Sequence, residues 1–439
     1  MPTKTYERQK ESGALQVQLK TILNQVQHLV GFVYQEIELL GKKGQPLAIK
    51  VQIAEHAGQL ARCSKCVKPA PCYDRLRARC WLHKPLWDIP VYFHYAPRRV
   101  KCAEHGVVVE HMPWNVGKRP YTRAMMCFLA QWARRLSWLE TGRCFQTSWE
   151  AVYRSVQWFV QWGLEHRKLE GVEAIGIDEI HWGKGKRSAA FLTVLYQIDQ
   201  GCRRLLWVGP KRTQATLKRG LQALGPEVVK GLKFVCSDMW KPYLQVIAQQ
   251  ASQAVHVLDR FHITQHLNKA VDEVRRGESS RLRAAGKVKA EQLKGMRWKL
   301  LRRGASVRGR ARQKLQRLFW SKLATGRAWQ LKESFEAFWR YRHVTWARAF
   351  LDIWCTRALR SRLEPMHRVA RMLRAHEELI LNWFRAKGEL SSGAVEGLNN
   401  KIRVMTRRSY GFRTYKAMVV ALYHTLGRLP EPTPINNSC

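Results

Sequence analysis

The sequence predicts an α/β protein: a mixed β-sheet with a large α-helical insertion, preceded by a small β head and a helical domain. Short β-branched runs within residues 173–262, bounded by Gly, Pro or charged residues, are typical of buried strands. Residues 263–389 have the apolar spacing of helices. The alternating Leu47, Ile49 and Val51 predict strands in the head.

The composition predicts a folded protein that binds a polyanion. Apolar residues make up 46% of the 439 residues, and 77 Lys and Arg against 33 Asp and Glu give a net charge of +44. Double-stranded DNA is the expected partner, because each neutralised phosphate releases counterions; an anionic membrane surface is the alternative. The sequence has no long uncharged apolar run and no signal-peptide core, so we expect a cytoplasmic location and no membrane partner. Eleven cysteines there indicate thiols or a metal site.

Residues 1–115 predict a head with a zinc-binding ribbon. A helix over 15–29 should precede two strands, over 32–39 and 47–54. A C-x-x-C and a C-x-x-H motif provide four ligands for a tetrahedral structural zinc: Cys63, Cys66, Cys102 and His105. Three nearby residues could substitute as ligands: Cys72, Cys80 and His83. The alternative is scattered reduced cysteines without a metal.

Residues 116–170 predict a helix-turn-helix DNA-binding domain. Helices over 122–135 and 137–143 should precede a third helix, which starts at a capping box of Thr147 and Glu150. Three polar residues should face a DNA groove: Ser148, Arg154 and Gln157. An ordinary three-helix bundle would have the same pattern, but the charge of the chain favours DNA binding.

Residues 171–262 and 390–428 predict a ribonuclease-H-like sheet. A strand ending at Asp178, a hairpin over 190–208, and alternating helices and strands describe such a sheet. Asp178 and Asp238 follow apolar runs, so their carboxylates should meet at the carboxyl edge of the sheet.

A late helix should bring a third acid to this sheet. Ser391 or Ser392 can cap the helix. Apolar residues at helical spacing form its core face: Val395, Leu398, Ile402 and Met405. Glu396 falls in the first turn and shares the opposite side with Asn400 and Arg403.

The helical insertion, residues 263–389, carries dense positive charge. Residues 275–318 contain sixteen Lys and Arg against Glu278 and Glu291. We expect this segment to lack an apolar core and to bind DNA phosphates without reading sequence. Five glycines should break its helices: Gly277, Gly286, Gly295, Gly304 and Gly309. Asp352 and Glu377 should form surface ion pairs, and the tail over 429–439 should be disordered.

The acids predict two-metal chemistry on DNA. Asp178, Asp238 and Glu396 offer the oxygen ligands that magnesium prefers, with manganese as a substitute. Two such ions about 4 Å apart can activate an attacking oxygen and stabilise a leaving one. Asp259, after a third apolar run, is interpreted as structural ahead of catalytic, and Glu179 should face away from Asp178. Three residues should contact DNA or pack with neighbours: His181, Trp182 and His262. Three arginines should clamp phosphates beside the cut: Arg403, Arg407 and Arg408.

Four segments resemble the DDE transposases of bacterial insertion sequences, in particular the ISL3 family: GIDEIHWGKGKR, SDMW, DRFH and SGAVEGLNNKIRVMTRRSYGFR. The resemblance covers most of the chain and implies a ribonuclease-H-like catalytic domain with catalytic acids at Asp178, Asp238 and Glu396. It implies binding to terminal inverted repeats, magnesium-dependent cleavage at the element ends, and transfer of the 3′-hydroxyl ends to target DNA. It also implies a homodimer or higher oligomer on DNA, associated with the bacterial nucleoid. The family usually has Cys where this chain has His105.

Two other functions stay possible on sequence grounds. A DNA-binding regulator without catalysis would keep the head and the helix-turn-helix, but it would not need all three acids, which this chain retains. A ribonuclease-H-like nuclease or resolvase would not need a sequence-reading head, and this chain is predicted to have two DNA-reading modules.

Overall fold

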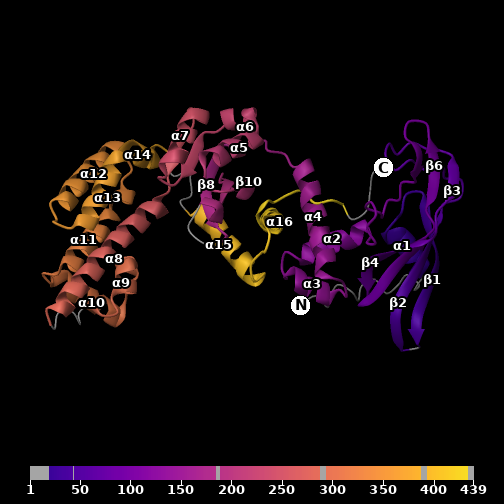
Figure 1. Ribbon diagram of the computed structural model, residues 1–439, viewed down its shortest axis with the longest axis horizontal. Helices are drawn as coiled ribbons and strands as arrows, with labels where there is room; N and C mark the ends of the chain where they lie inside the picture. The colour runs from indigo at the N-terminus through magenta and orange to yellow at the C-terminus, as the bar shows by residue number, and fades with distance from the viewer. Residues whose placement is uncertain (1–18, 43, 184–187, 287–292, 387–392, 434–439) are drawn as a thin grey trace, which may run out of the picture. The chain divides into compact units, whose positions relative to one another are not determined.

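The computed structural model describes residues 19–42, 44–183, 188–286, 293–386 and 393–433. The chain forms two compact units (Figure 1). The first comprises residues 1–167, 408–410 and 429–439, and the second comprises residues 168–407 and 411–428. None of the described helices is long and apolar enough to cross a membrane.

The first unit begins with a helix and a four-stranded sheet in the order β1-β2-β5-β4. These elements are α1 (Leu19–Val26), β1 (Phe32–Lys42), β2 (Gln45–Glu55), β4 (Arg79–Leu86) and β5 (Ile89–Tyr95). β2 and β5 are parallel, whereas the outer pairs are antiparallel. The hairpin of β1 and β2 confirms the two strands predicted there, because the alternating apolar residues Ile49, Val51 and Ile53 are buried under the sheet.

A second, smaller sheet in the same unit packs against both Cys motifs. It has the order β3-β6-β7 and consists of β3 (Cys72–Arg75), β6 (Arg98–Cys102) and β7 (Gly106–Val109), all antiparallel. Its core contains five buried residues: Ala61, Cys63, Ala70, Val100 and Cys102. Two of these five are predicted metal ligands, so the apolar core alone is small.

Three helices complete the first unit: α2 (Arg123–Trp132), α3 (Trp138–Cys144) and α4 (Trp149–His166). The predicted capping box at Thr147 is wrong by one residue. Thr147 donates its backbone N–H to the Gly142 carbonyl and so still belongs to the turn. Ser148 is the cap of α4, and its hydroxyl accepts from the Ala151 N–H at 3.1 Å.

The second unit contains a mixed five-stranded sheet in the order β10-β9-β8-β11-β12. Its strands are β8 (Ala174–His181), β9 (Phe191–Gln197), β10 (Arg204–Pro210), β11 (Phe234–Ser237) and β12 (Val255–Leu258). β8, β9 and β10 are antiparallel, and β8, β11 and β12 are parallel. A 3-10 turn, η2 (Ser188–Ala190), precedes β9.

Helices cover both faces of this sheet (Figure 1). On one face lie α5 (Gln214–Leu224), α6 (Pro226–Lys230) and α7 (Lys241–Gln250), which share a core with Ile175 and Ile177 of β8. On the other lie α15 (Ala394–Arg408) and α16 (Tyr415–Leu426). The four predicted core residues of α15 are buried, as its apolar spacing indicates.

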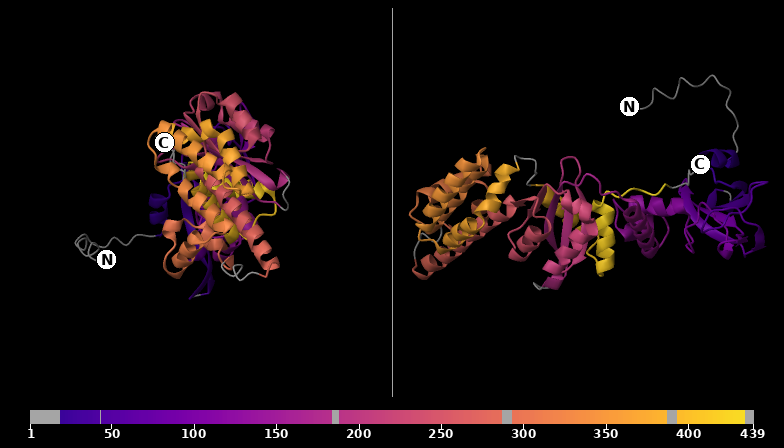
Figure 2. Two further views of the ribbon diagram at one scale, coloured as in Figure 1. Left: turned by 90° about the vertical axis from the view of Figure 1, so that its left-hand side faces the viewer. Right: turned by 90° about the horizontal axis from the view of Figure 1, so that it is seen from above.

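In the described part of the insertion there are seven helices: α8 (Arg260–Ala284), α9 (Arg297–Leu301), α10 (Gly309–Trp320), α11 (Ala324–Phe335), α12 (Val344–Leu359), α13 (Glu364–Ala375) and α14 (Glu377–Arg385). The 3-10 turns η4 (Gly304–Ser306) and η5 (Phe338–Arg340) lie between α9 and α10 and between α11 and α12. Figure 2 shows these helices together in one bundle. The bundle is joined to the sheet through α14, where the Asn382 side-chain amide donates to the His256 carbonyl of β12 at 2.7 Å.

The predictions for the basic segment need two corrections. The segment does contribute to the apolar core of the insertion, through Leu293, Met296, Leu300, Val307, Leu315 and Leu318. Helical spacing allows this, because cations occupy the solvent side of α10 while Leu315 and Leu318 face inward. Gly277 lies inside α8 and does not break it. Gly286, Gly295 and Gly309 do have the positive φ of chain breaks.

The start of the tail is ordered, contrary to the prediction. Leu429 is buried, and Glu431 forms an ion pair with Arg134 at 2.5 Å. The Cys127 thiol donates to the Pro432 carbonyl at 3.6 Å. Residues 434–439 lie outside the described part of the chain.

Candidate active site and metal centre

Three elements of the second unit each carry one of the predicted catalytic acids. Asp178 lies within β8, Asp238 directly follows the neighbouring β11, and Glu396 lies in the first turn of α15. Burial raises the pKa of Asp178, and the charge of Asp238 raises it further. Hydrogen bonds oppose this, since Asp178 accepts from the Glu179 N–H and from the Asn399 side-chain amide.

Asp259 is a fourth acid in the same group. It caps α8, where its carboxylate accepts from the Phe261 N–H at 2.9 Å. Burial raises its pKa, and the nearby charges of Asp178 and Glu396 raise it too. The capping contact fits the structural role that the sequence favours, but the side chain also faces the other acids. His262 lies beside it, with 4.0 Å between Nε2 and Oδ2.

Arg212 is a member of the site that the sequence reasoning missed. Its guanidinium donates to Glu179 at 2.8 Å and to Asp238 at 2.9 Å, and it lies over the Trp240 ring at 4.3 Å. Glu179 points to the face of β8 opposite Asp178, as alternation predicts, and meets Asp238 through this arginine. Burial and the Asp238 charge raise the pKa of Glu179. An arginine two residues beyond β10 carries no sequence signal for this position.

The acids suit a hard divalent cation. Carboxylate oxygens are the donors that magnesium prefers, and a cation would offset both the burial and the Asp238 charge that raise the pKa of Asp178. The Arg212 guanidinium donates to one Asp238 oxygen, and the backbone N–H of Trp240 donates to the other at 3.0 Å. Among the described residues, only the Cys/His group below brings three or more possible ligand atoms within 4.8 Å of one another, so the carboxylates are more widely spaced.

The first unit holds that Cys/His group, and it consists of the four residues predicted: Cys63, Cys66, Cys102 and His105. The Cys66 and Cys102 sulfurs are 3.7 Å apart, and His105 Nδ1 lies 3.6 Å from the Cys102 sulfur and 3.8 Å from the Cys63 sulfur. Two thiolates bound tetrahedrally at about 2.3 Å from zinc lie about 3.8 Å apart. The spacing therefore fits a tetrahedral metal, with Nδ1 as the nitrogen donor.

Backbone N–H groups of the C-x-x-C motif favour the thiolate form of Cys63. The Lys65 N–H donates to the Cys63 sulfur at 3.4 Å. The backbone N–H of Cys66 is the main cause that lowers the pKa of Cys63.

The three alternative ligands lie outside this group. His83 is buried, bonds Thr122 at 3.0 Å and stacks on Phe93 at 4.3 Å. Cys72 and Cys80 are exposed.

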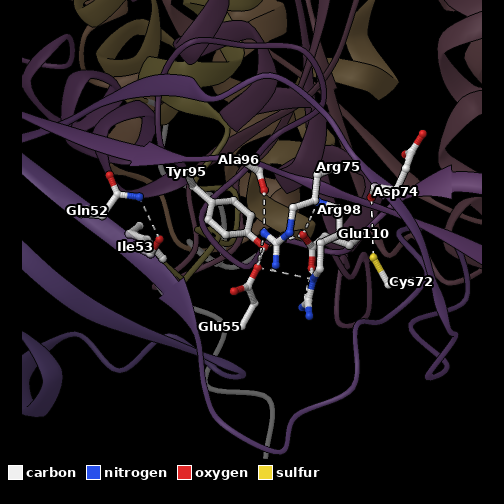
Figure 3. Close-up of polar contacts among 10 residues, drawn as sticks. All are labelled: Gln52, Ile53, Glu55, Cys72, Asp74, Arg75, Tyr95, Ala96, Arg98 and Glu110. Atoms are coloured by element: carbon white, nitrogen blue, oxygen red, sulfur yellow. Dashed lines mark hydrogen bonds and ion pairs between the residues drawn. The ribbon is translucent and has the colours of Figure 1, made fainter.

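A buried polar network ties this centre to the larger sheet (Figure 3). Glu110 forms a backbone bridge with Cys63, and its side chain accepts from Arg98 and from the Tyr95 hydroxyl at 2.6 Å. Tyr95 and Glu55 belong to the four-stranded sheet, and their side chains are 2.7 Å apart. Glu110 is 1% exposed and Tyr95 2%, so their hydrogen bond is buried, whereas Glu55 and Arg98 are partly exposed.

The predicted DNA contacts differ in availability. Arg154, Arg403 and Arg407 are exposed, and Gln157 is half-buried. Ser148 is exposed too, but its hydroxyl serves as the α4 cap. Arg408 is not free to clamp phosphate, because its guanidinium donates to the carbonyls of Arg134 and Arg135 at 2.9 and 2.8 Å.

Three further predicted contacts and the acidic pairs can also be placed. His181 is exposed and lies against Phe191, and Trp182 packs against Tyr415. His262 faces the acids, as described above. Asp352 and Glu377 form the predicted surface ion pairs, with Arg374 and Arg348.

Comparison with known proteins identifies the family. Residues 175–422, more than half of the chain, match the sequence profile of a transposase family, the DDE transposases of the ISL3 type. The chain is 26% identical over 407 residues to the transposase for insertion sequence element IS1557 of Mycobacterium tuberculosis, covering 87% of this chain and 89% of that protein. It is 25% identical over 391 residues to the transposase for insertion sequence element IS1001 of Bordetella parapertussis, covering 87% and 92%. The chain therefore belongs to the DDE transposases of the ISL3 type.

Proposed function

We propose that this transposase binds the terminal inverted repeats of an insertion sequence, cleaves DNA at the element ends and joins the freed 3′-hydroxyl ends to target DNA. The observation that supports the proposal is the electrostatic influence among the acids: the charge of Asp238 acts on Asp178, and the charges of Asp178 and Glu396 act on Asp259. Three antiparallel strands followed by parallel β11 and β12 support a ribonuclease-H-like catalytic domain. We further propose the other domains as the sequence predicts them: a zinc-ribbon head, a helix-turn-helix domain and a basic helical insertion.

The three acids would hold magnesium, with manganese as a substitute. When bound, such ions supply charge neutralisation at the reacting phosphate and activation of the attacking oxygen. Arg212 contacts one oxygen of Asp238, and this contact must loosen for both oxygens to become ligands. Cleavage is hydrolysis of a phosphodiester and joining is transesterification by the 3′-hydroxyl, so no Ser or Tyr of the chain need form a covalent intermediate.

The first unit would recognise the element ends. The exposed Arg154 and the half-buried Gln157 on α4 would contact the DNA groove, while Val152 and Val156 are buried. Zinc in the Cys/His group would fix the three-stranded sheet. Arg403 and Arg407 would bind phosphates beside the cut. We further propose assembly as a homodimer or higher oligomer on DNA, in a nucleoid-associated bacterial protein.

Incubation with labelled terminal-repeat DNA tests this function. With magnesium, the wild-type protein should produce cleaved and joined products; without metal it should only bind. Asp178→Asn, Asp238→Asn and Glu396→Gln should each abolish both reactions and retain DNA binding in a mobility-shift assay, because phosphate affinity comes from the basic surface. Asp352→Asn, which alters only a surface ion pair with Arg374, is the matched control.

The possible outcomes separate the alternatives. Near wild-type cleavage by Asp238→Asn would contradict the catalytic assignment. Binding to the repeats without cleavage by the wild-type protein would indicate a DNA-binding regulator. Cleavage of any DNA without joining would indicate a nuclease.

A further inference from the structure

A chain of hydrogen bonds connects a buried tyrosine to the first catalytic acid. The Tyr196 hydroxyl, from β9, donates to the side-chain amide oxygen Oδ1 of Asn399, on α15, at 2.9 Å. The Asn399 amide nitrogen donates in turn to Asp178 Oδ2. Tyr196 is fully buried, so its ring cannot swing away from this position. Asn399 therefore lies between β9, which holds its oxygen, and β8, whose acid it contacts.

The chemistry of the three groups fixes which way the Asn399 amide points. An ionised Asp178 can only accept hydrogen bonds, so the amide NH2 must face it, and the carbonyl oxygen is left for the tyrosine O–H. Aspartate at position 399 would put a second carboxylate against Asp178. Alanine would leave the buried Tyr196 hydroxyl and one Asp178 oxygen without these partners.

Packing fixes the register of the same helix on the same strand. A Cβ at Gly176 would lie 2.6 Å from the Val395 side chain, so α15 approaches β8 more closely than any other residue would allow. Gly176 and Asp178 share one face of β8, and Val395 and Asn399 share one face of α15. Two residues along a strand advance about 6.6 Å, and four along a helix about 6 Å, so both contacts form in a single register.

This register places Glu396, which precedes Asn399 by one helical turn. A slip of α15 by one turn would move Glu396 about 5.4 Å along the helix axis and would break both the Val395 and the Asn399 contacts. The hydrogen-bond chain and the Val395–Gly176 packing together fix the register of α15 on β8, and the hydrogen-bond chain acts on both Asp178 and Glu396. It holds the Asp178 carboxylate directly and Glu396 through the helix.

We propose that Asn399 is a positioning residue for the active site: held by Tyr196, it orients Asp178 and sets α15 so that Glu396 faces the same metal. The inference rests on the proposed function. Asn399→Ala should weaken metal binding and slow cleavage, each by roughly 10- to 100-fold, the range found for residues that orient metal ligands. Tyr196→Phe removes only the hydroxyl and should have a smaller effect of the same kind.

Manganese binding, followed by electron paramagnetic resonance of the full chain, provides a readout apart from activity. Wild type, Asn399→Ala, Tyr196→Phe and the double variant are compared, together with cleavage of terminal-repeat DNA across a magnesium titration. Asn400→Ala is the matched control, because this exposed neighbour bonds only Arg403 at 2.8 Å among the contacts of the described residues. The double variant should be no worse than Asn399→Ala, since Tyr196 acts through Asn399. Circular dichroism verifies that each variant folds.

The results distinguish an error in the positioning role from an error in the proposed function. If Asp178→Asn abolishes cleavage while Asn399→Ala keeps wild-type manganese affinity and magnesium dependence, the positioning role is wrong and the proposed function stands. Equal losses in Asn399→Ala and Asn400→Ala would also overturn the positioning role. If Asp178→Asn itself cleaves normally, the proposed function is wrong. Additive effects of Tyr196→Phe and Asn399→Ala would show that Tyr196 does not act through Asn399, which contradicts the proposed chain.

Discussion

Removing metal from the Cys/His group should unfold the three-stranded sheet of the first unit while the four-stranded sheet persists. Three of the five residues in the smaller core are not ligands, and burying Ala61, Ala70 and Val100 contributes roughly 4 kcal/mol at about 0.8 kcal/mol per carbon. A structural zinc contributes about 10–16 kcal/mol in small peptides, so the metal stabilises this sheet more than its apolar core does. The four-stranded sheet packs in a separate core of twelve buried residues, with Trp81 and Phe93 among them.

Hydrogen exchange on the full chain, with and without a chelator, measures this difference. Amides of the Cys63–Val67 turn and of the β6–β7 hairpin should exchange at least about 1000-fold faster without metal, which corresponds to about 4 kcal/mol of local stability. Amides of β1 and β2 should keep their protection. Elemental analysis should find one zinc per chain in the untreated protein.

Single substitutions identify the ligands. Cys63→Ser should reproduce the effect of the chelator, whereas Cys72→Ser and Cys80→Ser alter exposed cysteines of the same head and should not. A purified protein without zinc, or a β6–β7 hairpin that stays protected after chelation, would refute the reasoning. So would Cys72→Ser if it behaved like Cys63→Ser.

Neutralising the exposed cations of α10 should weaken binding to terminal-repeat and random DNA alike; these residues are Arg310, Arg312, Lys314 and Arg317. The slope of log affinity against log salt should become shallower by roughly 0.9 for each phosphate that the variant no longer binds. Loss of end preference at an unchanged slope would instead show that α10 reads sequence. Glu278→Ala should lower the free energy of unfolding in urea by roughly 1–3 kcal/mol, because this buried carboxylate accepts hydrogen bonds from the Ala324 and Thr325 amides and the Thr325 hydroxyl. By the same measurement, the exposed ion pair of Glu377 with Arg348 should contribute under about 1 kcal/mol. Burial lowers the pKa of His83 to about 3, so the unfolded chain binds this proton before the folded one does, and stability should fall by up to about 2 kcal/mol as pH drops from 6.5 to 5. His83→Gln should lack this part of the acid sensitivity, and an unchanged slope would contradict it.

Periodicity predicted those parts of the fold that burial decides. The hairpin of β1 and β2 and the buried face of α15 follow from apolar spacing alone, because side chains at one interval must share one face. The Cys/His group followed from ligand type and spacing, since each C-x-x-C or C-x-x-H turn brings two donors to one ion.

Contacts between distant segments decided what the sequence could not predict. Arg212 belongs to the acidic site through its long side chain: β10 lies three strands from β11 in the sheet order, yet the guanidinium reaches Glu179 and Asp238 from the segment between β10 and α5. The α4 cap moved to Ser148 because the Thr147 N–H is already bonded to Gly142. Charge counting alone gave the wrong expectation for the basic insertion, since a segment can present cations on one face of a helix and bury leucines on the other.

The insertion and the acidic site are mechanically connected through α8. Asp259 caps the first turn of this helix, and the same helix continues without a break to Ala284, burying Leu267 and Val271 in the core of the insertion. The Asn382 bond to β12 adds a second connection from α14. The bundle therefore cannot rotate as an independent body without disturbing either the α8 cap or the β12 contact. Because the charges of Asp178 and Glu396 also act on Asp259, the first turn of α8 belongs to the acidic group as well as to the insertion.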